Sequence, residues 1–227
     1  MTENRSGAAP RQVLRGRRNP VTAVLPVLIV VNQTVGVACQ FVQHTDPRFP
    51  LAYFTVDSAV LAGVIALLAL LVGQFRGAWQ LRLAAAVGVC VSAVVFAAVI
   101  APATQTGTWF QPHDDWFMRT ANLLLHGTAP VLVVADYVAR AEATSVRRSV
   151  SWAYVWPLTY LAGLLAVAAV FGGDTIPYPF LRPSVVGWPT ATGAVIALIA
   201  LVAVVSAMLS VLCRVVIRTR ARGESSV

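Results

Sequence analysis

The chain contains six long runs of predominantly apolar residues, and this feature limits most strongly how it can fold. A helix needs about 20 apolar residues to cross a hydrocarbon core of about 30 Å. With 58% hydrophobic and 11% charged residues, the 227-residue chain also departs from the composition of soluble domains. We therefore predict an all-α integral membrane protein, a six-helix bundle with spans at about 21–41, 51–74, 81–103, 116–138, 152–171 and 190–216.

Polar segments flank this predicted membrane domain, which extends over residues 19–217. Residues 1–18 are predicted to be a disordered, Arg-rich cytoplasmic tail, and residues 218–227 a second, disordered cytoplasmic tail. The first apolar run is longer than the apolar region of a signal peptide, and no small-residue cleavage site follows it. We therefore interpret it as a span.

All 17 basic residues are arginines, against nine acidic residues, and they are distributed unevenly around the spans. Fourteen lie on one side of the predicted bundle, which leaves Arg48, Arg119 and Arg182 on the other. Because cytoplasmic loops carry the excess of basic residues, both termini are predicted to be cytoplasmic in a multi-pass protein of the cell membrane. The absence of lysine, with abundant Ala, Val and Arg, indicates a GC-rich bacterial source.

The basic charge also bears on binding partners. The arginines flank apolar runs and form no stripe on a soluble surface, which excludes a soluble nucleic-acid-binding protein. The Arg-rich tails are expected to attract anionic lipid head groups. The sequence leaves the oligomeric state open.

Few polar side chains lie within the predicted spans, and these are the candidates for function, because a polar group in lipid needs a partner. The interiors of the third and sixth segments carry only Ser92, Ser206 and Ser210 as hydroxyl residues, so both segments are predicted to be scaffold. Asp136 lies four residues before Arg140, a spacing that predicts an ion pair on one helix face at the membrane interface.

His126 is the one histidine within a predicted span, because His44 and His113 fall in loops. Asn122 lies four residues before it on the same helix face, and Pro130 lies four residues after it. Since proline lacks an N–H, the carbonyl of His126 loses its helical partner, and we predict a kink there. The alternative is an ordinary interhelical hydrogen-bonding histidine.

Two hydroxyl residues and an acidic residue lie near the start of the second segment. Thr55 and Ser58 share a helix face, whereas Asp57 points to another side. An ionisable group within a span marks a functional hypothesis, so Asp57 is a candidate. Thr55 and His126 lie at similar predicted depths, because each helical residue adds about 1.5 Å. A hydroxyl beside an imidazole is the minimum for a base-activated nucleophile.

Several short motifs follow one another along residues 53–188. They are Phe54-Thr55, Asn122-x-x-x-His126 with Pro130, Pro157-x-x-Tyr160 and Tyr178-Pro179-Phe180-Leu181. In this order they resemble the androgen-induced protein 1/FAR-17a family and its bacterial Pr6Pr relatives. The resemblance implies a six-span membrane protein, and the animal members are threonine hydrolases of fatty acid esters of hydroxy fatty acids. It implies Thr55 as the nucleophile and His126 as the essential histidine.

The chemistry of these residues agrees with an intramembrane lipid-ester hydrolase. A threonine hydroxyl must lose its proton as it attacks, and His126 would accept that proton. Asn122 is expected to orient the imidazole or, with Tyr160, to donate to the developing oxyanion. Ser58 and Asp57 are supporting candidates. The expected substrate is a membrane lipid or a fatty acid ester.

A non-enzymatic membrane protein is the competing class: a small transporter or proton-linked carrier, or a lipid-binding scaffold. Asp57 and His126 would then line a polar path. No inverted repeat supports a transporter. No cofactor or metal is expected, because a second intramembrane histidine for a haem is missing, and Cys39, Cys90 and Cys213 lack zinc-ligand spacing.

Overall fold

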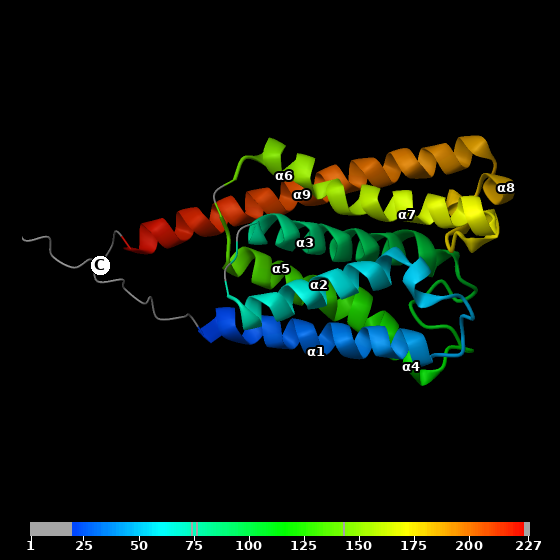
Figure 1. Cartoon of the computed structure of the whole chain (residues 1–227), viewed down its shortest axis with the longest axis horizontal. Coiled ribbons are helices and arrows are strands. Elements are labelled where there is room, and N and C mark those ends of the chain that lie inside the picture. Colours follow the sequence, from blue (N-terminus) through cyan, green and yellow to red (C-terminus); the bar gives the residue numbers. More distant parts are fainter. Residues whose placement is uncertain (1–19, 74, 76, 143, 225–227) are drawn as a thin grey trace, which may run out of the picture.

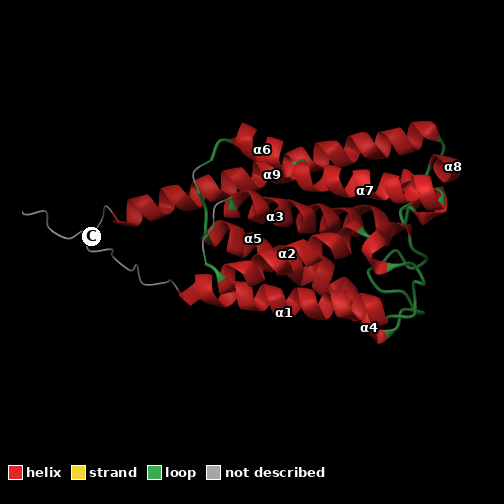
Figure 2. Cartoon of the chain, viewed as in Figure 1, coloured by secondary structure: helices red, strands yellow, loops and turns green. Residues whose placement is uncertain are grey.

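The computed structural model describes residues 20–73, 75, 77–142 and 144–224. This part of the chain is helical without strands (Figure 2), and six of its helices are long and apolar enough to cross a membrane. The predicted all-α class and the six long apolar helices are therefore confirmed within the described residues, while the predicted tail 1–18 lies outside them. The spans are Ala23–Val42, Phe54–Leu71, Ala78–Ala103, Trp116–Ala139, Val146–Phe171 and Trp188–Arg222.

Three of the spans are built from more than one helical segment. The third joins α3 to a π-helical segment, the fourth contains a π-helical segment between α4 and α5, and the fifth joins α6 to α7. The helices are α1 (Pro20–Val42), α2 (Phe54–Leu71), α3 (Ala78–Val95), α4 (Trp116–Asn122), α5 (Ala129–Ala139), α6 (Val146–Ala153), α7 (Val155–Phe171), α8 (Pro183–Val186) and α9 (Trp188–Glu224).

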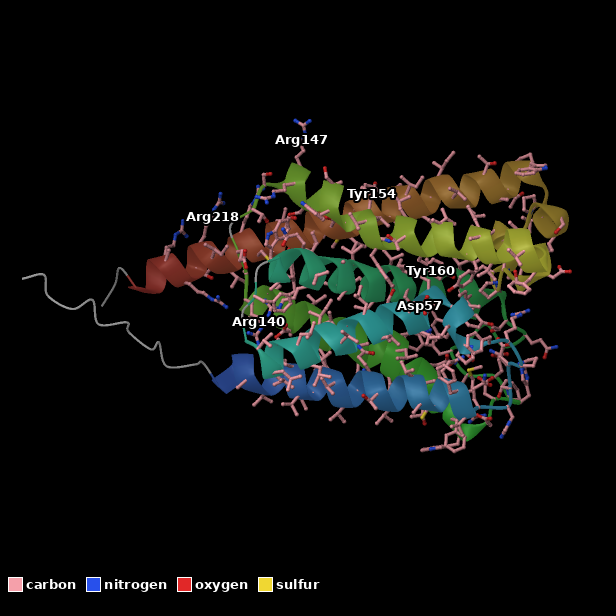
Figure 3. All side chains as sticks on the ribbon, in the orientation of Figure 1. Asp57, Arg140, Arg147, Tyr154, Tyr160 and Arg218 are labelled. Atoms are coloured by element: carbon pink, nitrogen blue, oxygen red, sulfur yellow. The ribbon has the colours of Figure 1, made fainter. Side chains whose placement is uncertain are left out.

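The bundle has two distinct ends (Figure 1). The start of α1 and the end of α9 lie together at one end, which we call the Arg-rich end, and Figure 3 shows Arg140 and Arg218 toward it. The opposite end, which we call the loop end, holds α8 and the connections 43–53, 104–115 and 172–187. This arrangement follows from an even number of spans joined by short connections.

Helix α3 occupies the centre of the bundle. It packs against α2 and α5 on one side and against α6 and α9 on the other, and its span has the largest buried share of the six. Leu83 and Val87 are fully buried, and Gly88 lets neighbouring helices approach closely. A Cβ at Gly88 would lie 2.7 Å from the Ser58 hydroxyl and 3.2 Å from the Trp156 ring. Small residues of this kind allow tight helix packing in lipid.

Several span boundaries differ from the prediction for identifiable reasons. The second span begins at Phe54, after a 3₁₀ turn at Pro50–Ala52, and ends before Gly73, which has a φ of 74°. The fifth begins earlier, at Val146, and breaks at Tyr154 because Pro157 has no N–H to donate to the preceding turn. Helix α9 continues to Glu224 through most of the tail that was predicted to be disordered, and its basic last turns suit the negative end of the helix dipole.

The predicted Asp136–Arg140 ion pair is present, and it is part of a larger buried cluster. The Nε of Arg140 lies 2.8 Å from Oδ1 of Asp136, and the Nε of Arg82 lies 3.7 Å from Oδ2. Asp136 and Arg82 are 5% and 4% exposed, so the cluster lies inside the bundle and not at the interface. It joins α3 to α5 near the Arg-rich end.

Candidate active site

Two spans contain a π-helical segment at the loop end, and a proline follows each. The first is η2 (Phe96–Ile100), with Pro102 after it, and the second is η4 (Leu123–Thr128), with Pro130 after it. At the end of η4 the N–H of Ala129 bonds to the carbonyl five residues earlier, which is the π-helical pattern. The kink predicted at Pro130 is therefore a π bulge, which accommodates a residue that cannot donate a backbone hydrogen bond.

Helix α1 packs tightly against the bulge in η4. The side-chain amide of Asn32 donates to the carbonyl of Leu124 at 3.1 Å, and the Thr128 hydroxyl donates to the side-chain oxygen of Asn32. One helical turn further along α1, a Cβ at Gly36 would lie 2.6 Å from a methyl carbon of Leu125. These contacts hold in place the segment that carries His126.

A chain of hydrogen bonds connects three spans beside the bulge. Thr55 Oγ1 on α2 lies 2.6 Å from Ser92 Oγ on α3, and Ser92 Oγ lies 3.3 Å from Nδ1 of His126 on η4. The structure thus brings Thr55 and His126 to one site, bridged by Ser92. With Nδ1 unprotonated, Ser92 donates to His126 and accepts from Thr55, so the three groups form a path for one proton.

The imidazole of His126 is held by aromatic neighbours. The ring of Phe96 stacks on it with centroids 3.9 Å apart and planes 4° apart, and Trp109 contacts the Phe96 ring edge-on at 5.3 Å. This stack resists rotation of the imidazole about its side-chain bonds. It fixes the ring plane with Nδ1 at Ser92 and leaves His126 partly exposed to a cavity.

Two cavities of opposite character meet at Thr55. The apolar cavity, with about 830 Å³ of empty space partly open to the surroundings, lies between α2, α3, α7 and α9. The polar cavity, with about 790 Å³ likewise partly open, lies at the loop end. Thr55, Ile100 and Tyr178 line both cavities. The apolar cavity is lined by residues such as Val91, Val95, Leu161, Leu198 and Val202, and the polar cavity by Gln40, Asp46, Thr104, Gln111, Asn122 and His126.

The connection 104–115 covers the polar cavity and is organised by one glutamine. The side-chain nitrogen of Gln111 donates to the hydroxyls of Thr104 and Thr106 at 2.7 and 2.9 Å, and its backbone N–H donates to Asp114. Gln111 is buried although it lies in a loop. An ordered loop of this kind gives the cavity a defined wall.

Asp115 ties the same connection to the start of α4 and to the neighbouring loop. Its carboxylate accepts the backbone N–H of Met118 at 2.7 Å, as a helix N-cap, and the backbone N–H of His44 at 2.7 Å. The hydrogen bond from His44, followed by that from Met118, lowers the pKa of Asp115. Asp115 therefore holds the loops as a carboxylate.

Tyrosines at the loop end form the rim above Thr55. The hydroxyl of Tyr178 accepts the backbone N–H of Phe54 at 2.9 Å and contacts Thr55. The Tyr53 hydroxyl donates to Asp46, and burial together with this hydrogen bond raises the pKa of Tyr53 to about 12. Burial also raises the pKa of Tyr178, so both phenols are neutral at physiological pH.

Two of the predicted supporting residues have structural partners. Ser58 is fully buried and accepts the indole N–H of Trp156 at 3.0 Å, which joins α2 to α7. Tyr160 donates its hydroxyl proton to the carbonyl of Ala52 at 2.7 Å. The role predicted for Tyr160 as an oxyanion donor requires this hydrogen bond to be exchanged, because a phenol has one proton to donate.

The other two supporting candidates separate in the structure. Asn122 lines the polar cavity with His126, but its side-chain nitrogen lies 3.4 Å from the carbonyl of Trp109, so it contacts the covering loop. Asp57 lies on another side of α2 and lines a third cavity that contains neither Thr55 nor His126. This agrees with the helix geometry that pointed Asp57 away from Thr55.

The residue that links the two predicted catalytic groups, Ser92, was missed by the sequence analysis, which regarded its span as scaffold. A lone serine among apolar residues carries no signal of its own. Phe96 and Trp109 were missed for the same reason, since aromatic residues near a membrane interface are common. A neighbouring signal did exist in Pro102, which marks the π segment before it as Pro130 marks the other.

The described residues contain no group of three or more His, Cys, Asp or Glu side chains that could hold a metal ion. Comparison with protein families, curated proteins and solved structures gives no match. The resemblance to the androgen-induced protein 1/FAR-17a family accordingly remains a prediction from short motifs.

Proposed function

We propose that the protein is an intramembrane lipid-ester hydrolase in which Thr55 is the nucleophile and His126 the base. One observation supports this most strongly: Thr55 lies where an apolar and a polar cavity meet, and its hydroxyl is hydrogen-bonded through Ser92 to His126. An ester of a fatty acid likewise has an apolar part, its acyl chain, and a polar part, its ester group. A nucleophile at the junction would meet the carbonyl carbon between the two halves.

In the acylation step the Thr55 oxygen attacks the carbonyl carbon of the ester. The Thr55 proton passes to Ser92 as the Ser92 proton passes to Nδ1 of His126, so no charge remains on either hydroxyl. The tetrahedral intermediate collapses, the bond to the alcohol oxygen breaks, and the alkoxide takes the proton from His126. The products of this step are acyl-Thr55 and the free alcohol.

The start of α2 would supply the donors for the oxyanion. The first N–H groups of a helix have no partner within it, and they sit at the positive end of its dipole. The N–H of Phe54 is used by Tyr178, whereas Thr55 and Val56 follow directly in the same turn, and Val56 lines the polar cavity. A hydrogen-bond donor to the oxyanion typically raises the rate by a factor of about 10²–10³.

Hydrolysis is completed by water entering through the polar cavity. His126 is partly exposed there and accepts a proton from the water as it attacks acyl-Thr55. The bond between the acyl carbon and Thr55 breaks, the proton returns to Thr55 through Ser92, and the fatty acid is released. In this scheme the acyl chain occupies the apolar cavity, and the alcohol group leaves through the polar one.

Labelling with alkyl fluorophosphonates tests the assignment. We expect a hexadecyl fluorophosphonate to modify Thr55 of the purified protein, located by mass spectrometry of the labelled peptide. The hexadecyl reagent should modify Thr55 faster than an ethyl fluorophosphonate does, because the hexadecyl chain fills the apolar cavity. Labelling should be absent in Thr55→Ala and slowed in His126→Ala. The matched control Ser206→Ala removes a buried hydroxyl on α9 that lines neither cavity, and it should label like wild type.

A label on Ser92 would instead identify Ser92 as the nucleophile and overturn the role given to Thr55. Absence of any label on folded protein, combined with substrate-dependent proton uptake by vesicles, would overturn the hydrolase proposal. It would favour the proton-linked carrier, with the same polar groups lining a path.

We infer that both termini are cytoplasmic, so that the polar cavity opens to the outer face of the cell membrane. The described arginines at the Arg-rich end outnumber Arg48, Arg119 and Arg182 at the loop end, which supports this orientation. Alkaline phosphatase inserted after Gly107, in the loop that covers the polar cavity, should be active in cells. A phosphatase fused to the C-terminus should be inactive, and the reverse pattern would show the opposite orientation.

A further inference from the structure

Asp57 lines a cleft of its own at the loop end. The cleft lies between α2 and α7, has about 1260 Å³ of empty space with a broad opening, and includes Arg48, Trp156, Tyr160 and Gly163 in its wall. Figure 3 shows Asp57 and Tyr160 in the half of the bundle away from Arg140 and Arg218. Neither Thr55 nor His126 lines it. The cleft is therefore a second site, which shares the side chain of Tyr160 as a wall with the apolar cavity at Thr55.

The cleft carries one uncompensated negative charge. Three charged residues line it, and two of them have partners: Arg48 lies 3.7 Å from Asp46, and Asp174 accepts a hydrogen bond from Arg182 at 3.0 Å. Within the described residues no hydrogen bond or ion pair joins the carboxylate of Asp57 to another side chain. A carboxylate within a span calls for a partner of opposite charge or for water.

Trp156 and Tyr160 line the same cleft as Asp57, and their polar groups already have hydrogen-bond partners. The indole N–H of Trp156 donates to Ser58, and the hydroxyl of Tyr160 donates to the carbonyl of Ala52. The two side chains therefore offer the cleft aromatic carbon and no free hydrogen-bond donor. A carboxylate beside aromatic rings is the arrangement that recognises organic cations, through charge and cation–π attraction.

The wall contributed by α7 leaves room for an alkyl chain. A Cβ at Gly163 would meet no heavy atom within 4 Å, and Leu164 and Val167 continue the apolar wall along α7. The span that contains α7 has the smallest buried share of the six, so this side of the cleft faces the lipid. A molecule in the membrane can reach the cleft laterally.

We propose that this cleft binds a lipophilic cation, an alkyl chain bearing an amine or quaternary ammonium group, with the cation at Asp57 and the chain along Gly163 and Val167. Binding here requires no ester chemistry and is independent of the function proposed for Thr55. The carboxylate of Asp57 provides the selectivity for a cation over a neutral amphiphile of the same length. The open glycine provides the space for the chain.

Equilibrium binding of radiolabelled dodecyltrimethylammonium to the purified full-length protein in a neutral maltoside detergent tests this proposal. Wild type should bind it saturably, and neutral dodecanol should compete at least tenfold less well. Asp57→Asn keeps the shape of the side chain and removes its charge, and it should weaken binding at least tenfold. Gly163→Leu fills the cleft from the other helix and should weaken binding similarly.

The matched control is Gly193→Leu on α9, where a Cβ also meets open space but outside the cleft, and it should bind like wild type. Thr55→Ala should also bind like wild type, which separates this test from that of the hydrolase. Equal binding by Asp57→Asn, or equal competition by dodecanol, would overturn the proposal. Size-exclusion profiles identify any misfolded variant, and the two cleft variants on different helices give independent answers.

Discussion

Replacing Thr55 with alanine is expected to reduce ester hydrolysis by the purified protein to the uncatalysed background. The change removes the attacking oxygen and leaves the two cavities and His126 in place. A long-chain p-nitrophenyl ester provides the measurement, because release of nitrophenol reports the acylation step directly. Thr55→Ser should keep measurable activity, since it retains a hydroxyl at the same position.

The other two members of the relay should have graded effects on the same reaction. His126→Ala should lower kcat/KM by about 10²–10⁴, the range for loss of a general acid–base group. Ser92→Ala should lower kcat/KM less than His126→Ala does, because a water molecule at the vacated position can bridge Thr55 to the imidazole. The double variant Thr55→Ala/Ser92→Ala should have the same kcat/KM as Thr55→Ala alone, because the effects of groups that act as a unit are not additive.

The control for these variants is Ser206→Ala, which exchanges for alanine a fully buried serine on α9 that lines neither cavity. It should retain wild-type kcat/KM. Wild-type turnover in Thr55→Ala would contradict the assignment of the nucleophile. A larger loss in Ser92→Ala than in Thr55→Ala would transfer that role to Ser92.

The largest expected effect on stability comes from the buried cluster near the Arg-rich end. Replacing Asp136 with alanine removes the carboxylate that lies 3.7 Å from the Nε of Arg82, a residue that is 4% exposed inside the bundle. Removing one member of a buried ion pair typically costs about 3–5 kcal/mol. The loss of the Asp136 carboxylate should carry a smaller energetic penalty at Arg140, because Arg140 lies at the end of α5 and its long side chain can extend toward the head groups. Unfolding by denaturing detergent, followed by far-ultraviolet circular dichroism, measures the loss.

A double variant separates the charge effect from simple loss of packing. Arg82→Leu with Asp136→Leu removes both buried charges and fills the space with apolar atoms, so it should recover most of the stability lost in Asp136→Ala. The opposite outcome is a free energy of unfolding of Asp136→Ala that lies within about 0.5 kcal/mol of wild type, the range of surface substitutions. It would show that another group takes the place of Asp136 beside Arg82. The double variant should not alter hydrolysis, since neither residue lines the cavities at Thr55.

The positions of the spans were predictable to within a few residues, whereas their internal breaks were not. Hydrophobicity decides that residues 116–138 cross the membrane, because an apolar run of that length has no other low-energy environment. It does not reveal that the run contains a π segment. The form of that break depends on Asn32 and Gly36 of α1, which contact the bulge across the bundle. Pro130 marked the place, and the neighbouring helix determined the geometry.

The candidate site was predictable in part for a similar reason. Thr55 and His126 stood out because polar groups are rare in a span, and counting residues placed them at one depth. Ser92 did not stand out, because its role depends on which helix face meets α2 and η4. Asp57 and Tyr160 were grouped with the site by their position in the chain. The structure places Asp57 on another side of α2, away from Thr55, whereas Tyr160 lines the apolar cavity with Thr55 and donates to the carbonyl of Ala52.

The sequence alone therefore determined the helical class and the six apolar spans, because apolar length is a local property that each segment carries by itself. It also marked the polar residues that a membrane protein keeps only with a partner or a role. The tertiary structure decided which of them meet. The bridge through Ser92 and the separate cleft at Asp57 depend on the rotation of each helix about its axis and on its neighbours. Those are set by packing between segments distant in the chain, which no single segment encodes.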